Sequence, residues 1–101
     1  MIAPTESMGG SSAKPKFALG QLVATPAVLE VVTSEDIMLA LSRHLYGDWG
    51  DLDPEDSAEN ERSLAEGFRL LSSYRSANGT KFWIITEHDR SVTTVLLPSD
   101  Y

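Results

Sequence analysis

The sequence contains no cysteine and no long apolar run, and each absence excludes a class of protein. Without cysteine the chain has no disulfide, no thiolate metal site and no cysteine nucleophile. No window approaches the run of about 18 apolar residues that a transmembrane helix needs, so no membrane association is expected. The residues before Phe17 lack a basic start and an apolar stretch, so we expect no secretory signal there and a cytoplasmic protein.

Basic side chains are also scarce. The 101 residues include 8 Lys and Arg against 15 Asp and Glu, which gives a formal net charge of −7. This balance argues against broad electrostatic attraction to nucleic acid, so no direct DNA binding is expected. Neither His44 nor His88 lies in a spaced metal motif, and no glycine-rich phosphate loop opens a helix. We therefore expect no metal site and no cofactor.

Composition and patterning favour one small α+β domain. Residues 1–16 are rich in Gly, Ser and Pro and are predicted to form a disordered tail, and residues 17–101 form the domain. Three cap signals, Thr25-Pro26, Thr33 and Asp53-Pro54, predict helices over residues 27–32, 34–46 and 54–66. Residues 17–25 are predicted to form either a short strand or an extended arm.

The last third of the chain is predicted to form a three-stranded antiparallel meander, or a four-stranded sheet if residues 17–25 join it. The strands are expected over residues 68–76, 80–87 and 91–97, with Asn78-Gly79 as a two-residue hairpin turn. With a two-residue second turn as well, the register would place Tyr74, Trp83 and Thr94 in one row on one face.

The densest chemical feature is an acidic run over residues 48–61, which contains no Lys or Arg before Arg62. Its seven carboxylates are Asp48, Asp51, Asp53, Glu55, Asp56, Glu59 and Glu61. A calcium loop starting at Asp51 fails, because Asp56 occupies the glycine position and Arg62 the position of the bidentate Glu. The run is either a solvated helix start or a surface that faces a basic partner.

Two aromatic residues beside this run extend the partner-binding hypothesis. Trp49 either folds back onto the core or serves, with Tyr46, as an exposed aromatic anchor. The candidate partner-binding residues are Tyr46, Asp48, Trp49, Asp51, Asp53, Glu55, Asp56 and Glu59.

An enzymatic alternative rests on the order of the elements. Helices followed by an antiparallel meander resemble the layout of small metal-independent ribonucleases of the barnase and RelE type. Such chemistry needs a general base, a general acid and cations for the phosphate. The residues expected to supply them are His88, Arg90 and Tyr74, with Arg75, Thr93 and Thr94 as further candidates on or between the meander strands.

Several segments resemble a family of small bacterial proteins. They are FALGQLVATP from Phe17, RH at Arg43, GDWG at Gly47, WIITE at Trp83 and DRSVTTVLLP at Asp89. Together they resemble the uncharacterised plasmid-related proteins of plasmids and integrative elements. The resemblance implies a mobile-element setting and an accessory role. We therefore expect a non-enzymatic protein that binds a basic protein partner, such as a nucleic-acid-handling enzyme. A homodimer through an edge of the sheet is a third hypothesis.

Overall fold

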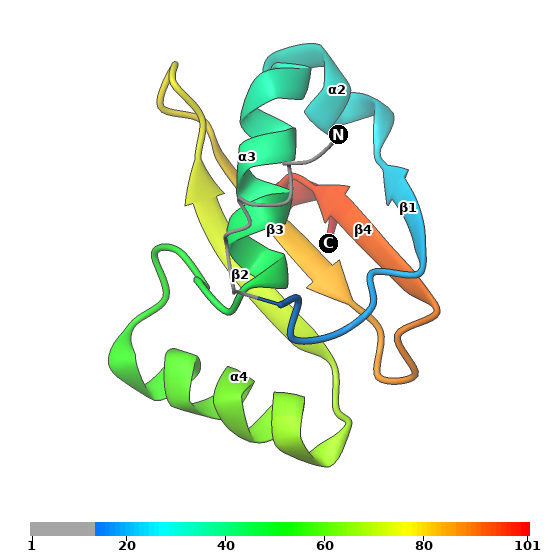
Figure 1. Cartoon of the computed structure of the whole chain (residues 1–101). Coiled ribbons are helices and arrows are strands. Elements are labelled where there is room, and N and C mark those ends of the chain that lie inside the picture. The colour runs from blue at the N-terminus through cyan, green and yellow to red at the C-terminus, as the bar shows by residue number, and fades with distance from the viewer. Residues whose placement is uncertain (1–13) are drawn as a thin grey trace, which may run out of the picture.

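The computed structural model describes residues 14–101 and confirms the α+β fold class. Figure 1 shows helix α3 lying across one face of a four-stranded sheet, with α4 beside the sheet. The helices are α2 (Pro26–Val31), α3 (Ser34–Leu45), α4 (Pro54–Glu66) and the short 3₁₀ turn η1 (Pro98–Asp100). The strands are β1 (Gln21–Ala24), β2 (Leu70–Arg75), β3 (Lys81–Thr86) and β4 (Val92–Leu96).

The predicted tail, residues 1–16, lies mostly outside the described residues. Lys16 is described, and its backbone N–H donates to the carbonyl of Leu45 at 2.9 Å. This bond attaches the chain to the end of α3 one residue earlier than the predicted start of the domain.

The helix boundaries agree with the cap signals. The side chains of Thr25, Thr33 and Asp53 each accept a hydrogen bond from the backbone N–H three residues later. Gly67 ends α4 in the left-handed conformation. These signals succeed because a cap satisfies its own helix end and depends on few distant contacts.

The sheet is mixed, which corrects the prediction of a purely antiparallel sheet. Its strand order is β1-β4-β3-β2, and β1 pairs with β4 in parallel, with Gln21 opposite Val92. The three C-terminal strands do form the predicted antiparallel meander. Residues 17–25 therefore contribute a short fourth strand, and α2, α3 and α4 all follow it before the next strand, β2.

The predicted register of the meander is wrong in both hairpins. Trp83 pairs with Ser73 and Leu96, whereas Tyr74 pairs with Phe82. In the first hairpin the Ser76 N–H bonds the Thr80 carbonyl, so the loop has three residues, 77–79, and ends with Gly79 at φ +87°. This matches a type I turn followed by a glycine bulge, which shifts the register by one and sends Tyr74 and Trp83 to opposite faces.

The hydrophobic core lies between α3 and the sheet. Ile37 and Leu41 of α3 are buried with Phe82, Ile84 and Val95 of the strands. Their spacing on α3 gives the apolar stripe expected of a helix that covers a sheet. Among the described residues, no helix combines the length and the apolar character needed to cross a membrane.

Candidate partner-binding surfaces

All seven carboxylates of the acidic run are exposed, but they divide into paired and unpaired groups. Three of them form ion pairs with arginines of the same chain: Arg43–Asp48 at 2.8 Å, Arg62–Glu59 at 3.5 Å and Arg75–Asp51 at 3.7 Å. Within the described residues this leaves Asp53, Glu55, Asp56 and Glu61 without an arginine partner. The run therefore remains negative after its internal pairs are counted.

Asp48 and Asp53 have structural roles. Asp48 accepts two hydrogen bonds from the Arg43 guanidinium and one from the backbone N–H of Gly50. The bond from Arg43 holds the pKa of the Asp48 carboxyl below its usual range. Asp53 accepts the N–H of Asp56 at 2.8 Å and caps α4. These two carboxylates are thus committed to the local fold.

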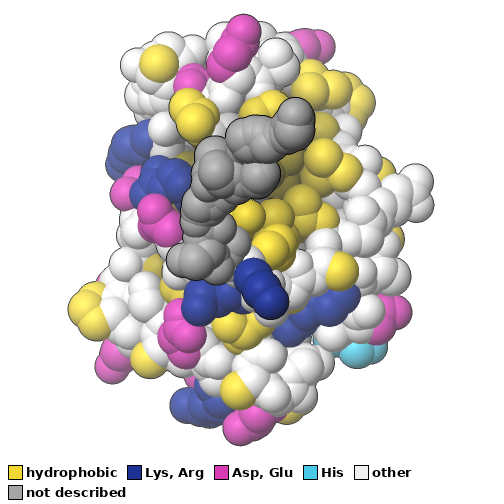
Figure 2. Space-filling view, in the orientation of Figure 1, with side chains coloured by type: hydrophobic (Ala, Val, Ile, Leu, Met, Phe, Trp, Pro, Cys, Tyr) yellow, Lys and Arg dark blue, Asp and Glu magenta, His cyan; other side chains and the backbone are white. Residues whose placement is uncertain are grey.

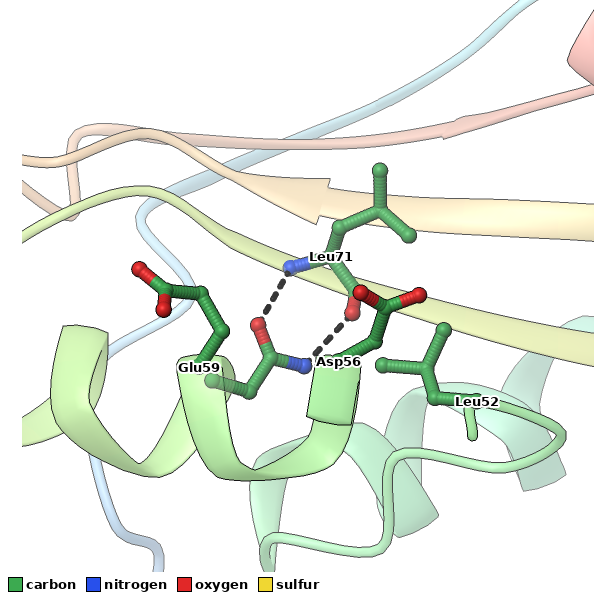
Figure 3. A pocket seen from close by; sticks show the side chains of 5 residues that line it. Leu52, Asp56, Glu59 and Leu71 are labelled. Atoms are coloured by element: carbon green, nitrogen blue, oxygen red, sulfur yellow. Dashed lines mark hydrogen bonds between the residues drawn. The ribbon is translucent and has the colours of Figure 1, made fainter. Parts of the chain in front are cut away.

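Two acids of the run, the unpaired Asp56 and the Arg62-paired Glu59, line a small apolar pocket at the junction of α4 and β2. The pocket has a volume of about 230 Å³ and is lined by Leu52, Leu71, Asn60, Asp56 and Glu59. Figure 3 shows the Asp56 side chain beside Leu52 and Leu71, while the Glu59 side chain extends from α4 on the side away from Leu52. The Arg62 and Glu59 side chains are both 60% exposed, so water and salt screen their ion pair.

The floor of this pocket also closes the outer edge of β2. The Asn60 side chain donates to the Leu71 carbonyl at 2.6 Å and accepts from the Leu71 N–H at 3.1 Å, as Figure 3 shows. Further along the same edge, the Ser73 N–H bonds the Trp49 carbonyl and the Ser73 carbonyl accepts the Asp51 N–H. The outward backbone groups of Leu71 and Ser73 are therefore satisfied within the chain, which protects this edge from other strands.

Gly50 makes the second part of this closure sterically feasible. It forms a bridge to Ser73 and has φ +79°. A Cβ atom at this position would lie 2.0 Å from the Ser73 carbonyl oxygen. Only glycine combines this φ value with so close a backbone approach.

The structure separates Trp49 and Tyr46, which corrects their prediction as one exposed anchor. Trp49 is only 5% exposed, and its indole N–H donates to Glu61 at 2.8 Å. Its ring lies edge-on to His44 and is stacked with Phe17. Trp49 therefore folds back onto the core, which was the other predicted possibility. Tyr46 is 40% exposed and lies with residues of β1 and α3, away from the acidic pocket.

The three residues proposed for catalysis are not brought together. Tyr74 is 1% exposed and donates its hydroxyl to the Asp48 carbonyl, and burial raises the pKa of its phenol. Arg90 belongs to the second hairpin, at the opposite end of β3, where it donates to the carbonyls of Phe68, Ser63 and Glu87. His88 is exposed in that hairpin. The arrangement offers no shared cleft in which an acid and a base could meet one phosphate.

Sequence reasoning missed a buried polar chain centred on His44. The imidazole is fully buried, with Nδ1 2.5 Å from the Ser72 hydroxyl and Nε2 2.9 Å from the Thr86 hydroxyl. Thr86 in turn lies 2.8 Å from the Thr93 hydroxyl, which donates to the Leu19 carbonyl. One sequence signal could have found it: Ile37, Leu41 and His44 have the spacing of a single helix face, which places His44 among the core residues of α3.

The Leu19 carbonyl, at the end of this series of hydrogen bonds, determines which group donates in each of them. The Leu19 carbonyl can only accept, so Thr93 donates to it and must accept from Thr86. Thr86 then accepts from Nε2–H of His44, and Nδ1 accepts from Ser72. This is the neutral imidazole, and burial together with the nearby Arg90 charge lowers the pKa of His44 to about 4. Because Ser72 and His44 are both 0% exposed, the pair joins α3 to the sheet and is closed to substrate.

A separate apolar groove runs between α3 and β1. It has a volume of about 310 Å³ and is lined by Leu19, Leu22, Met38, Leu41, Ser42, Leu45 and Tyr46. Met38 is 62% exposed and Leu22 is 46% exposed. Figure 2 shows apolar side chains gathered on this part of the molecule. Patches of this kind on soluble domains commonly mark contact surfaces.

Comparisons with protein-family models, curated proteins and solved structures find no match to this chain. Within residues 14–101, the structure shows no group of three or more His, Asp or Glu side chains placed to hold a metal ion.

Proposed function

We propose that this protein is a small acidic accessory protein of a mobile element that binds a basic protein partner. The setting is what the resemblance to plasmid-related proteins implies. The binding surface is the acidic pocket, defined as Leu52, Asp56, Glu59, Asn60 and Leu71. The observation that supports this proposal is the combination of an apolar pocket with carboxylates on its rim.

The chemistry of the pocket specifies its occupant. Leu52 and Leu71 can take one aliphatic side chain, while Asp56 and Glu59 attract cationic groups on either side of it. The occupant is therefore a protein segment with an apolar residue flanked by Lys or Arg, as on the basic surface of a nucleic-acid-handling enzyme. Glu55, one turn before Glu59 on α4, adds to the same field.

A fluorescence-polarisation assay with labelled synthetic peptides tests the proposal. The probe is a Lys- and Arg-rich peptide with one central Leu, compared with the same peptide carrying Ser at that position. We expect the Leu peptide to bind more tightly, and its affinity to fall as NaCl rises from about 50 mM to about 300 mM. Replacing Leu71 by Ser should remove the difference between the two peptides.

A matched pair of triple variants separates the pocket from net charge. Glu55→Gln/Asp56→Asn/Glu59→Gln should weaken binding about tenfold, since three exposed charges contribute about 0.5 kcal/mol each. Glu30→Gln/Glu35→Gln/Glu66→Gln changes the net charge equally at exposed positions outside the pocket and should alter affinity by less than about twofold. Equal losses in both variants, or binding that ignores salt, would contradict the proposal.

A further inference from the structure

The two edges of the sheet differ in how they are closed. The outer edge of β2 is satisfied at Leu71 by Asn60 and at Ser73 by residues 49–51. On β1, the Gln21 N–H bonds the Ser91 carbonyl and the Thr25 N–H bonds the Val95 carbonyl, so residues 21, 23 and 25 face β4. The backbone groups of Leu22 and Ala24 therefore point away from the sheet, and no partner for them occurs within residues 14–101.

The open edge also lacks the features that usually protect one. Natural edge strands carry charged side chains, proline or bulges that prevent pairing with another strand. No charged residue occurs over residues 17–29, in a chain of which 23% is charged, and the first proline after Phe17 is Pro26, beyond the strand. Leu22 and Val23 are both exposed on β1. Such an edge is suited to pairing.

We propose that β1 pairs antiparallel with β1 of a second copy of this chain about a two-fold axis. The outward groups of Leu22 and Ala24 determine the register: Leu22 of each copy exchanges two hydrogen bonds with Ala24 of the other. Val23 then lies directly opposite Val23 of the second copy, in a pair without hydrogen bonds between the two residues. The two four-stranded sheets become one sheet of eight strands.

The distribution of charge favours a second copy of this chain as the partner of the β1 edge. Each chain carries a net charge of −7, so association is favoured where the two acidic regions stay far apart. The acidic run lies beyond β2, at the other edge of the sheet. Pairing through β1 separates the two β2 edges by seven strand spacings, roughly 35 Å, against a screening length of about 10 Å. A neutral edge gives a basic partner no charge to bind and gives a second copy no charge to repel it.

The side chains on the helix side of the pair fit the same arrangement. Leu22 of each copy projects toward α3 and lines the groove of about 310 Å³ that opens beside β1. A strand added to this edge carries its own Leu22 and Ala24 into the open side of that groove. Four hydrogen bonds and short strands make a contact at the small end of stable interfaces, so we expect a micromolar dimer.

Because the chain has no cysteine, single-cysteine variants test both the dimer and its register. Val23→Cys should form a disulfide-linked dimer under mild oxidation, since opposite residues in such a pair have Cα atoms about 4.5 Å apart. Gln21→Cys is the matched control, on the same face and two residues away. In the proposed register Gln21 lies opposite Thr25 of the second copy, so its two cysteines are too distant to bond.

Sedimentation of the wild-type chain over a concentration series supplies the second measurement. We expect a shift toward twice the 11.0 kDa mass of the chain. Val23→Lys should raise the dissociation constant at least tenfold, because two lysines would then face each other, whereas Leu39→Lys on exposed α3 surface should not. Each lysine variant is first checked for a native circular dichroism spectrum. A monomer at all concentrations, equal crosslinking of the two cysteine variants, or capture of only a foreign strand would overturn the proposal.

Discussion

Protonation of His44 should destabilise the fold over a defined pH range. The imidazole has a pKa near 6.5 in the unfolded chain and about 4 in the folded protein. The unfolded state therefore binds more protons between these values, and stability present above pH 6.5 is lost as the pH falls toward 4. The difference of about 2.5 pH units corresponds to about 3 kcal/mol, of which about 2 kcal/mol is lost by pH 5.

Protonation of His44 costs stability because the hydrogen bonds around the imidazole allow only one arrangement of donors and acceptors. A protonated imidazole would donate from Nδ1 toward Ser72, which now donates to that nitrogen. The charge would also lie in the buried core near the Arg90 guanidinium, which has the same sign. Both effects oppose protonation of His44.

Urea unfolding of a His88→Asn variant between pH 7.5 and pH 5 measures the effect with His44 as the sole histidine. Asp48 and Asp89 have pKa values below their usual range, so their stabilising contribution is lost only as the pH falls below about 5. His88→Asn/His44→Asn should lose the pH dependence. If that variant does not fold, an NMR titration of His44 in His88→Asn replaces it. A folded-state midpoint near 6.5, or equal stability at pH 7.5 and pH 5, would refute the argument.

Two further predictions concern residues that tie the elements together. Asn60→Ala should lower the free energy of unfolding by about 1–3 kcal/mol in urea titrations, because two bonds to Leu71 are lost, and light scattering should show more self-association through the opened edge. Arg90→Ala should cost about 1–2 kcal/mol through lost bonds to backbone carbonyls. Arg90→Gly should recover about 1 kcal/mol of that loss, since Arg90 has φ +60°; an Ala variant as stable as the Gly variant would contradict this account.

Features set by neighbouring residues could be predicted from the sequence, and features set by distant ones could not. Thr33 and Asp53 mark helix starts because their caps act within one turn. The order and number of meander strands follow from alternating runs and turn residues. The pairing of β1 with β4 depends on residues about 70 positions apart in sequence, and nothing local in residues 17–25 specifies that partner.

The register failed because the loop length, more than the turn residues, determines it. Asn78-Gly79 indicates a hairpin correctly, but Ala77 also belongs to the loop. One additional residue moves Trp83 from Tyr74 to Ser73. Trp83 and Thr94 still share a face, because the second hairpin is shifted by two residues, whereas the one-residue shift in the first hairpin sends Tyr74 to the opposite face.

The candidate site was predicted in part. Exposure of the acidic run follows from the repulsion among its charges, which opposes burial of any of them. Its division could not be predicted, since Arg43 and Arg75 reach Asp48 and Asp51 only after the chain folds. Trp49 was ambiguous for a related reason: a tryptophan between glycines can turn toward either the core or the solvent, and contacts with Phe17 and His44 decide.

The triple variant distinguishes two candidate roles for the acidic run, edge protection and partner binding. The run lies on the segment that closes the β2 edge, and negative charge beside a strand edge discourages pairing with other strands. If edge protection were the only role of these acids, Glu55→Gln/Asp56→Asn/Glu59→Gln would increase self-association and leave peptide affinity unchanged. If the pocket binds a basic partner, affinity falls and the Asn60 and Gly50 contacts alone keep the edge closed. Because those contacts satisfy the outward groups of both Leu71 and Ser73 without any carboxylate, we expect the second result.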